Sequence, residues 1–494
     1  MRLRFVLLLL LLPLAGCLPA VRSAPAPASA LGEEMRAIFE DTAFAHAHWG
    51  VVIRSLQTGE TLYSRNESKA FIPASNQKLL TGAAALELLG PDFRYRTEVV
   101  ATGPVQNGVM RGDLVVRASG DPTISWRFNE GDSRTVFRAW ADSLRAHGVR
   151  RIAGAVVGVD EVFDDPVYGW GWAWDDLGGQ FAAPVAGLQF NESSVLVELF
   201  PASRAGAPGI VALNPPSGHV RLENRTTTVE AGRPARIEIG YVELDDVLVV
   251  SGEIPRDTSG ISQRVGVRDP ARYFITALRE TLREAGIAVE GRAMLREDFD
   301  DDAPALRPGA RLFMHHSPPL REILPVMMKP SQNQIAEALL KTVAAEERGQ
   351  GRAAVGAQVV DSLFVAWGLE TGGLSMRDGS GMSRYNFLTP ILLIGLLERM
   401  TRSPHWELWY ASQPVAGIDG TLRSRMRGTP AEGNVHAKTG TLSNIRALSG
   451  YVTTADGERL VFAMLVNHHL RSAGDADRLI DAALIRLATF RRRN

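Results

Sequence analysis

The sequence has little cysteine, little net charge and no long apolar run. Its single cysteine, Cys17, excludes an intrachain disulfide. The formal net charge of the 494 residues is −1, so no global positive field exists to attract nucleic acid, and we expect no nucleic-acid partner. Apolar residues run only from Phe5 to Leu12 at the N-terminus, which is too short to span a bilayer stably.

Arrangements that suit a metal ion are also scarce. Ten histidines include the pairs His315-His316 and His468-His469, but His-Glu-x-x-His does not occur. The second pair ends a predicted strand, where adjacent side chains point to opposite faces and cannot readily chelate one ion. We therefore expect neither a catalytic metal nor another cofactor.

Lysine is rare as well, although basic residues are not. Arginine and lysine together number 54, and five of these are lysines: Lys69, Lys78, Lys329, Lys341 and Lys438. Two of the five lie in the short motifs Ser75-Asn-Gln-Lys78 and Lys438-Thr-Gly440. Lysine, unlike arginine, can lose its proton when it is buried, and it acts as a compact point charge. The rare lysines therefore indicate where the chemistry takes place.

The N-terminus predicts export. Arg2 and Arg4 precede the apolar run, and Leu14-Ala-Gly-Cys17 follows it and resembles a bacterial lipobox. We predict a signal peptide with a lipobox over residues 1–17, lipid attachment at Cys17 and a flexible leader over residues 18–30. The alternative is a signal cleaved among the alanines of residues 24–30, with Cys17 discarded. Either outcome places the protein in the periplasm or cell envelope. Membrane attachment is expected only in the first, through a lipid on Cys17.

Hydrophobic periodicity divides the rest of the chain into three parts. Helical, strand-like and again helical patterns occupy residues 31–48, 50–65 and 75–89. Residues 96–300 are rich in short strand-like runs, among them 237–250, and contain two helical patterns, 135–147 and 270–286. Helices are predicted next at 320–329, 332–347, 353–367 and 390–402, then strands at 435–441, 446–453 and 459–467, and a helix at 474–489.

Ser75-x-x-Lys78 is the first candidate catalytic motif. A helix that begins at Ser75 places Lys78 one turn later on the same face, at a helix N-terminus that favours negative charge. Serine is a weak nucleophile and needs an adjacent base, and lysine can serve only if burial or a neighbouring cation lowers its pKa. The structural alternative is that Ser75 merely caps the helix.

Two further motifs also contain hydroxyl, amine or amide side chains that could take part in catalysis or binding. Lys438-Thr-Gly440 lies in a predicted strand, where Lys438 and Thr439 can hold a carboxylate and Gly440 permits close approach to the backbone. Its alternative is an edge strand protected from aggregation by a lysine. Ser331-Gln-Asn333 begins a predicted helix, and Ser331 taken alone would be an ordinary N-cap.

Together and in this order, the three motifs are those of penicillin-binding proteins and serine β-lactamases. The chain resembles the D-alanyl-D-alanine carboxypeptidase/endopeptidase family, the class C low-molecular-mass penicillin-binding proteins. The resemblance covers nearly the whole mature chain and includes Gly120-Asp-Pro-Thr123, Ser317-Pro-Pro-Leu320 and Asp378-Gly-Ser-Gly-Met-Ser383. One departure is Gln332, because the middle position of the second motif is often Asp in the family.

The resemblance implies a role for each motif residue. Ser75 would form the acyl-enzyme, Lys78 would take its proton, and Ser331 and Asn333 would pass a proton to the leaving amine. The terminal carboxylate of the substrate would pair with the side chains of Lys438 and Thr439, next to Gly440. The backbone N–H groups of Ser75 and Thr441 would form the oxyanion hole. The implied partners are peptidoglycan stem peptides, with β-lactams as inhibitors.

The resemblance also implies the fold. We expect a mixed α/β (α+β) protein whose catalytic domain, of the penicillin-recognising serine transferase/β-lactamase type, has an antiparallel sheet flanked by helices. It would be assembled from residues 31–96 and 299–494. Two β-rich domains would be inserted in it: domain II, residues 97–164 and 246–298, and domain III, residues 165–245, within domain II.

Two other functions remain open at this point. A β-lactamase or esterase on the same scaffold would share the three motifs but would hydrolyse β-lactams quickly. A non-catalytic envelope protein would bind cell-wall peptides without cleaving them. The cluster Trp170, Trp172 and Trp174 around Asp175-Asp176 could bind glycan, although packing is the simpler interpretation.

Overall fold

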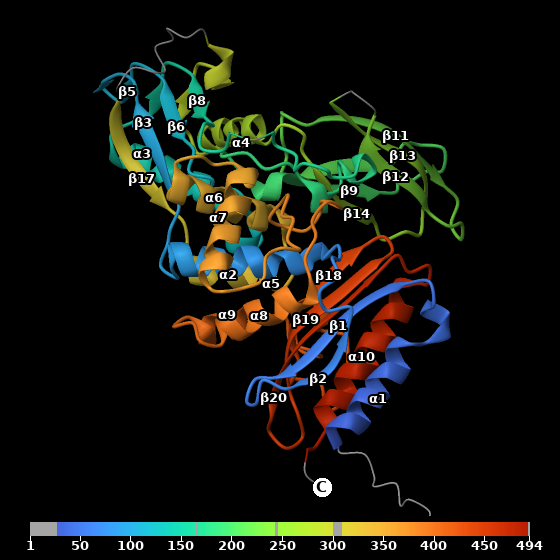
Figure 1. Ribbon diagram of the computed structural model, residues 1–494. Helices are drawn as coiled ribbons and strands as arrows, with labels where there is room; N and C mark the ends of the chain where they lie inside the picture. Colours follow the sequence, from blue (N-terminus) through green and yellow to red (C-terminus); the bar gives the residue numbers. More distant parts are fainter. Residues whose placement is uncertain (1–26, 165, 243–245, 300–308, 493–494) are drawn as a thin grey trace, which may run out of the picture.

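The computed structural model describes residues 27–164, 166–242, 246–299 and 309–492 (Figure 1). The predicted signal peptide, Cys17 and the leader up to residue 26 lie outside these ranges. None of the helices in the described ranges combines the length and apolar character that a membrane span requires.

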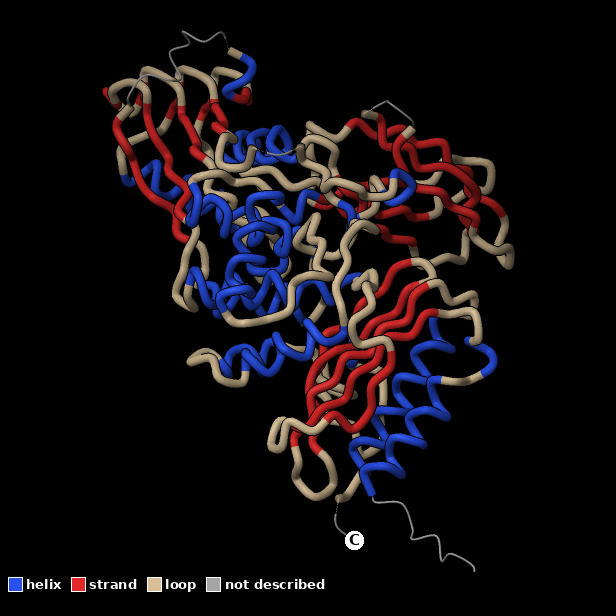
Figure 2. The backbone as a smooth tube through the Cα atoms, viewed as in Figure 1, coloured by secondary structure: helices blue, strands red, loops and turns tan. Residues whose placement is uncertain are grey.

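A five-stranded antiparallel sheet, with helices on both faces, forms one end of the molecule (Figures 1 and 2). Its order is β18 (His436–Leu442), β19 (Ile445–Thr453), β20 (Arg459–Asn467), β1 (His48–Ser55) and β2 (Thr61–Arg65). Helices α1 (Pro27–Phe39) and α10 (Ala473–Thr489) pack on one face with Phe462 and Met464. Ala463 and Leu465 contribute to the core on the other face. Strand β20 is therefore apolar at successive positions because both of its faces are buried.

The second face is covered by a helical layer. It consists of α2 (Gln77–Leu89), α5 (Leu320–Met328), α6 (Asn333–Arg348), α7 (Ala353–Ala366), α8 (Pro390–Met400) and α9 (Trp406–Ser412). Every residue of α2 from Gln77 to Leu86 is buried, so this helix lies inside the layer. The sequence pattern predicted these helices except α9, whose seven residues are too few to show a helical period.

Between α2 and α5 the described residues form four further sheets and two α-helices, α3 (Thr135–Ala146) and α4 (Pro270–Glu284). The first sheet contains β16 (Ala293–Leu295), β8 (Val156–Val159), β6 (Leu114–Arg117), β3 (Arg96–Ala101) and β17 (Ala310–His316). The second contains β15 (Ala288–Val289), β7 (Arg151–Ile152), β5 (Val109–Met110) and β4 (Val105–Gln106). The third contains β10 (Ile210–Asn214), β9 (Ser194–Phe200) and β14 (Ile261–Gly266), and the fourth contains β11 (Arg221–Val229), β13 (Val247–Pro255) and β12 (Arg236–Tyr241).

The strand-like run predicted at 237–250 is two antiparallel strands, β12 and β13, rather than one. The acidic stretch Glu243-Leu-Asp-Asp246 divides its two apolar halves. Apolar content alone does not reveal such a division, because each half separately satisfies a strand pattern.

Strand pairing suggests an adjustment of the proposed domain boundaries. Strand β17 pairs with β3, and β13 and β14 pair with β11 and β9. We propose that the chain returns to the catalytic domain after His316 rather than at residue 299, and that the inner inserted domain continues through β14. These pairings join segments far apart in sequence, so local patterns cannot reveal them.

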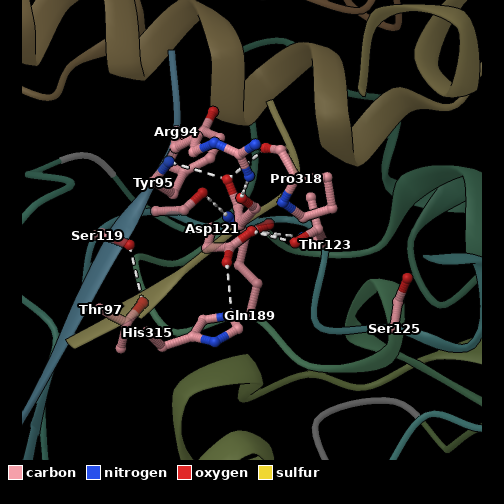
Figure 3. Close-up of polar contacts among 12 residues, drawn as sticks. Arg94, Tyr95, Thr97, Ser119, Asp121, Thr123, Ser125, Gln189, His315 and Pro318 are labelled. Atoms are coloured by element: carbon pink, nitrogen blue, oxygen red, sulfur yellow. Dashed lines mark hydrogen bonds and ion pairs between the residues drawn. The ribbon is translucent and has the colours of Figure 1, made fainter. Parts of the chain in front are cut away.

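A buried polar cluster lies where the chain enters and leaves the inserted region (Figure 3). The Oδ1 atom of Asp121 accepts hydrogen bonds from the backbone and hydroxyl of Thr123, and its Oδ2 atom lies 3.6 Å from Nε2 of His315. The hydroxyl of Ser317 accepts from the backbone N–H of Tyr95 at 2.9 Å. The Gly120-Asp-Pro-Thr123 and Ser317-Pro-Pro-Leu320 motifs thus hold the crossing between the two regions.

Candidate active site

Ser75 lies in a single 3₁₀ turn, residues 74–76, that leads directly into α2. The turn packs against strand β18, because Nδ2 of Asn76 donates to the carbonyl of Lys438 at 2.9 Å. Ser75 itself is half-buried. Its hydroxyl therefore lies at a helix N-terminus beside the edge of the sheet, where negative charge is favoured.

Lys78 is fully buried one turn after Ser75. Its Nζ atom contacts three oxygens: Ser75 Oγ at 3.1 Å, Asn333 Oδ1 at 2.6 Å and the carbonyl of Ser380 at 2.7 Å. Burial lowers the pKa of Lys78 to about 7, against the opposing effect of the Glu337 and Asp378 carboxylates. Burial is thus the first cause of the lowered pKa, and it makes Lys78 a base at neutral pH.

The Ser331-Gln-Asn333 motif forms the start of α6. Gln332 caps this helix, since its side-chain oxygen accepts from the backbone N–H of Ile335 at 2.7 Å. The unusual middle residue of the motif therefore has a structural role, and Ser331 is not the cap residue. Ser331 instead has a left-handed backbone with φ of 63°, a conformation that costs free energy in a non-glycine residue.

Lys438 is buried in β18, the edge strand of the sheet. Its Nζ atom donates to Ser331 Oγ at 2.8 Å and to the carbonyl of Thr439 at 3.0 Å. Burial, followed by repulsion from Lys78, lowers the pKa of Lys438 well below its ordinary value. A substrate carboxylate that reaches Nζ would favour the charged form of the amine.

The rest of the Lys-Thr-Gly motif continues toward the surface. The hydroxyl of Thr439 lies 2.7 Å from that of Thr421, and Thr441 is exposed. A Cβ atom on Gly440 would lie 2.6 Å from the carbonyl oxygen of Pro73. The glycine therefore permits close packing of β18 against the segment that carries the nucleophile. Its role in ligand approach stays a prediction.

The structure brings the residues predicted from the three motifs into two hydrogen-bonded groups. Lys78 joins Ser75 to Asn333, and Lys438 joins Ser331 to the sheet. The hydrogen bond from Asn76 to Lys438 connects the two groups. Cys17 lies outside the described residues.

Sequence reasoning missed several residues that complete the site. Glu337, four residues after Asn333 on α6, accepts from the backbone N–H groups of Gly379 and Ser380 at 3.0 and 2.8 Å. Burial raises the pKa of Glu337 to about 7. The available signal was its spacing, because Glu337 lies one helical turn after Asn333 and one turn before Lys341, on the same face of the predicted helix.

The tryptophan cluster has mixed surroundings. Trp170 and Trp174 are 61% and 72% exposed, whereas Nε1 of Trp172 donates to Oδ2 of Asp378 at 3.0 Å. The ring of Trp170 lies 4.7 Å from that of Tyr385. Packing therefore explains Trp172 better than it explains the other two. Among the described residues, no group of three or more His, Cys, Asp or Glu side chains could hold a metal ion.

Comparisons with known proteins identify relatives of this chain. The chain is 36% identical to the D-alanyl-D-alanine carboxypeptidase of Actinomadura sp. (strain R39), over 98% of this chain and 89% of that protein. It is 28% identical to the D-alanyl-D-alanine carboxypeptidase DacB of Haemophilus influenzae, over 87% and 86% of the two chains. The crystal structure of penicillin binding protein 4 (dacB) from Haemophilus influenzae matches with a TM-score of 0.77 and 25% identity, over 94% of this chain and 99% of that one.

These matches confirm the predicted family and the mixed α/β fold class. The model of the D-Ala-D-Ala carboxypeptidase 3 (S13) family matches residues 31–489, which is nearly the whole described chain. The chain therefore belongs to the D-Ala-D-Ala carboxypeptidase 3 (S13) family.

Proposed function

We propose that this protein is a serine DD-carboxypeptidase that removes the terminal D-alanine from peptidoglycan stem peptides. We also propose a DD-endopeptidase activity, in which the same site cuts D-alanyl–diaminopimelate cross-links. The observation that carries this proposal is the buried amine of Lys78, 3.1 Å from the Ser75 hydroxyl and with a pKa of about 7. A serine beside a neutral amine has the base that nucleophilic attack requires.

Acylation begins with proton transfer from Ser75 Oγ to the neutral amine of Lys78. The Ser75 oxygen then bonds to the carbonyl carbon of the penultimate D-alanine, and the negative charge develops on the carbonyl oxygen. We propose that the backbone N–H groups of Ser75 and Thr441 stabilise this oxyanion. Loss of one such donor typically costs about 2.7–4 kcal/mol.

Collapse of the oxyanion breaks the C–N bond and releases D-alanine, whose amine needs a proton. Ser331 can supply this proton from its hydroxyl and regain one from Lys438, which donates to it at 2.8 Å. The ammonium form of Lys438 also attracts the terminal carboxylate of the substrate, next to Thr439. Water then attacks the ester carbonyl, the C–O bond to Ser75 breaks, and Ser75 Oγ takes back the proton held by Lys78. One proton of the water passes to solvent, from which Lys438 regains its own, and the cycle is complete.

β-Lactams carry a reactive amide that Ser75 can open in the same way. We propose that they acylate Ser75 and leave slowly, in keeping with the name of the Haemophilus influenzae protein, penicillin binding protein 4. We further propose that the protein is exported to the periplasm or cell envelope and carries a lipid on Cys17, as its N-terminal sequence suggests.

The test is a time course of intact mass for the purified protein with benzylpenicillin, with mapping of the modified residue. Ser75→Ala is the matched control, because it removes one oxygen and leaves the base in place. Release of D-alanine from a peptide ending in D-Ala-D-Ala is measured in parallel, as is cleavage of a cross-linked dimer.

A long-lived adduct on Ser75 together with released D-alanine supports the proposal. Rapid loss of the adduct with consumption of the drug would instead indicate a β-lactamase. Folded protein without adduct or turnover would indicate a peptide-binding protein.

A further inference from the structure

A segment of the inserted region, residues 166–182, reaches the active site. It follows β8 and precedes β9, and we call it the tryptophan segment. The carbonyl of Phe181 accepts from Nδ2 of Asn333 at 2.6 Å, and Nε1 of Trp172 donates to Oδ2 of Asp378 at 3.0 Å. A Cβ atom on Gly171 would lie 2.9 Å from the Ser383 hydroxyl, so the backbone of the segment packs closely against the 378–383 loop.

Both contacts affect the orientation of the Lys78 amine, that is, the direction of its lone pair. A neutral amine has two N–H groups and one lone pair. Asn333 Oδ1 at 2.6 Å and the Ser380 carbonyl at 2.7 Å can each take one N–H. The lone pair is then directed at the third neighbour, the Ser75 hydroxyl at 3.1 Å. The two oxygen acceptors therefore decide whether Lys78 can receive the Ser75 proton.

The first acceptor depends on Phe181. The side-chain amide of Asn333 has one oxygen and one NH₂ group. Because its NH₂ group donates to the Phe181 carbonyl, its oxygen faces Lys78. Rotation of the amide by half a turn would place its oxygen against the Phe181 carbonyl, so that two acceptors would meet, and would direct the NH₂ group at the Lys78 lone pair that Ser75 needs.

The second acceptor is held by two carboxylates. On one side, Glu337 accepts from the backbone N–H group of Ser380 at 2.8 Å. On the other, Asp378 accepts from the N–H groups of Gly381 and Ser383 at 2.8 and 2.6 Å. Trp172 donates to the same Asp378 carboxylate from the inserted region. These hydrogen bonds to Asp378 favour one conformation of the loop.

Packing alone does not hold the residues beside the 378–383 loop. Trp172 and Glu337 both line a cavity of about 600 Å³ that also borders α7. Next to such a space, a side chain lacks contacts on one side and can move more easily. The polar contacts of Trp172 and Glu337 therefore restrain the 378–383 loop, together with the hydrogen bonds from Asn386 to Asp378 and from Thr81 to the Gly379 carbonyl.

We propose that the tryptophan segment is a positioning element for Lys78, because it holds both oxygen acceptors, Asn333 Oδ1 and the Ser380 carbonyl. The inserted region is then required for base catalysis. This inference rests on the proposed acyl-enzyme mechanism, and Trp172 acts through Asp378 and Ser380 without touching the substrate.

The test compares Trp172→Phe with Trp174→Phe, a control at a 72% exposed position of the same segment. Trp172→Phe keeps an aromatic ring and removes the N–H donor. The second-order rate constant for acylation by benzylpenicillin is measured from pH 5 to pH 10, together with the melting temperature. Trp172→His, which restores a ring N–H, is the rescue variant.

We expect Trp172→Phe to acylate about tenfold more slowly at pH 7, since small misplacements of catalytic groups have effects of this order or greater. We also expect the midpoint of its pH profile to rise, because a loosened loop admits water and weakens the desolvation of Lys78. Trp174→Phe should match the unchanged protein, and Trp172→His should recover part of the rate.

An unchanged rate and midpoint in folded Trp172→Phe would overturn the inference while leaving the proposed function intact. A slower rate with an unchanged midpoint and a matching loss of folded protein would also overturn it, because the role of Trp172 would then be structural only. Absence of acylation in the unchanged protein would overturn both the inference and the proposed function.

Discussion

The Oδ1 atom of Asn333 lies 2.6 Å from the Nζ atom of Lys78, although the two residues are 255 positions apart in the sequence. The contact joins α2 to α6, which lie on either side of the inserted region in the chain. The catalytic base therefore becomes complete only when both halves of the catalytic domain are in place.

Replacement of Lys78 should abolish acylation without loss of the fold. Lys78→Met keeps the length of the side chain and removes the amine, so we expect the acylation rate constant with benzylpenicillin to fall at least about 100-fold. Lys69→Met is the control, because Lys69 is exposed. Acylation of folded Lys78→Met at the normal rate would show that another group takes the proton.

The pH dependence of acylation should report the lowered pKa of Lys78, about 7. Only the neutral amine accepts a proton, so the rate should fall about tenfold per pH unit below this value and level off above it. Stopped-flow acylation from pH 5 to pH 10 measures the profile. A rate that keeps rising up to pH 10 would mean that Lys78 has the ordinary pKa of an exposed lysine.

The lowered pKa of Lys78 should also make the free energy of unfolding depend on pH. Between about pH 7 and the ordinary lysine pKa of 10.5, the unfolded state binds the Lys78 proton and the folded state does not. The free energy of unfolding contributed by Lys78 therefore rises with pH in this window. Urea titrations at pH 7, 8 and 9 measure the free energy of unfolding of both proteins. The value for the unchanged protein should rise relative to that for Lys78→Met, by up to about 1.4 kcal/mol per pH unit. Equal slopes for the two proteins would contradict the assignment.

Lys438 should matter most for substrates with a free terminal carboxylate. We expect Lys438→Ala to lower kcat/KM for a D-Ala-D-Ala peptide about 10- to 100-fold, which corresponds to one hydrogen bond to a charged group. The same peptide with a terminal amide is the control, and its kcat/KM should change much less. A similar loss for both peptides would place the role of Lys438 outside carboxylate binding.

Gly440 should tolerate no side chain, since a Cβ atom there would lie 2.6 Å from the Pro73 carbonyl. Overpacking of this kind typically costs about 1–3 kcal/mol, so we expect Gly440→Ala to lower both the melting temperature and the acylation rate. Gly240→Ala, at a strand position with open space around its Cβ, is the matched control. Normal stability and rate in Gly440→Ala would show that β18 can move away from the nucleophile at little cost.

Much of this molecule follows from local patterns. Strand β20 could be predicted because a continuous apolar run indicates a strand buried on both faces. Helices α6 and α10 could be predicted from their apolar periodicity. The pairing of β17 with β3 could not, because the two segments lie about 200 residues apart and neither contains a mark of its partner.

The candidate site shows the same division. Ser75, Lys78 and Lys438 stood out because their residue types and spacing are rare and suit one chemistry. Glu337 and Trp172 did not, because an acidic residue in a helix and a tryptophan in a loop have many ordinary explanations. Their importance comes from hydrogen bonds to the 378–383 loop, which the chain order does not reveal.

The sequence by itself determined the kind of chemistry, because a serine and a lysine one helical turn apart meet wherever the helix forms. Only the tertiary structure decided whether that lysine can act as a base. Its pKa depends on burial and on the carboxylates of Glu337 and Asp378, which come from distant parts of the chain. Desolvation and charge interactions act through space, so their effect on Lys78 exists only after the chain has folded.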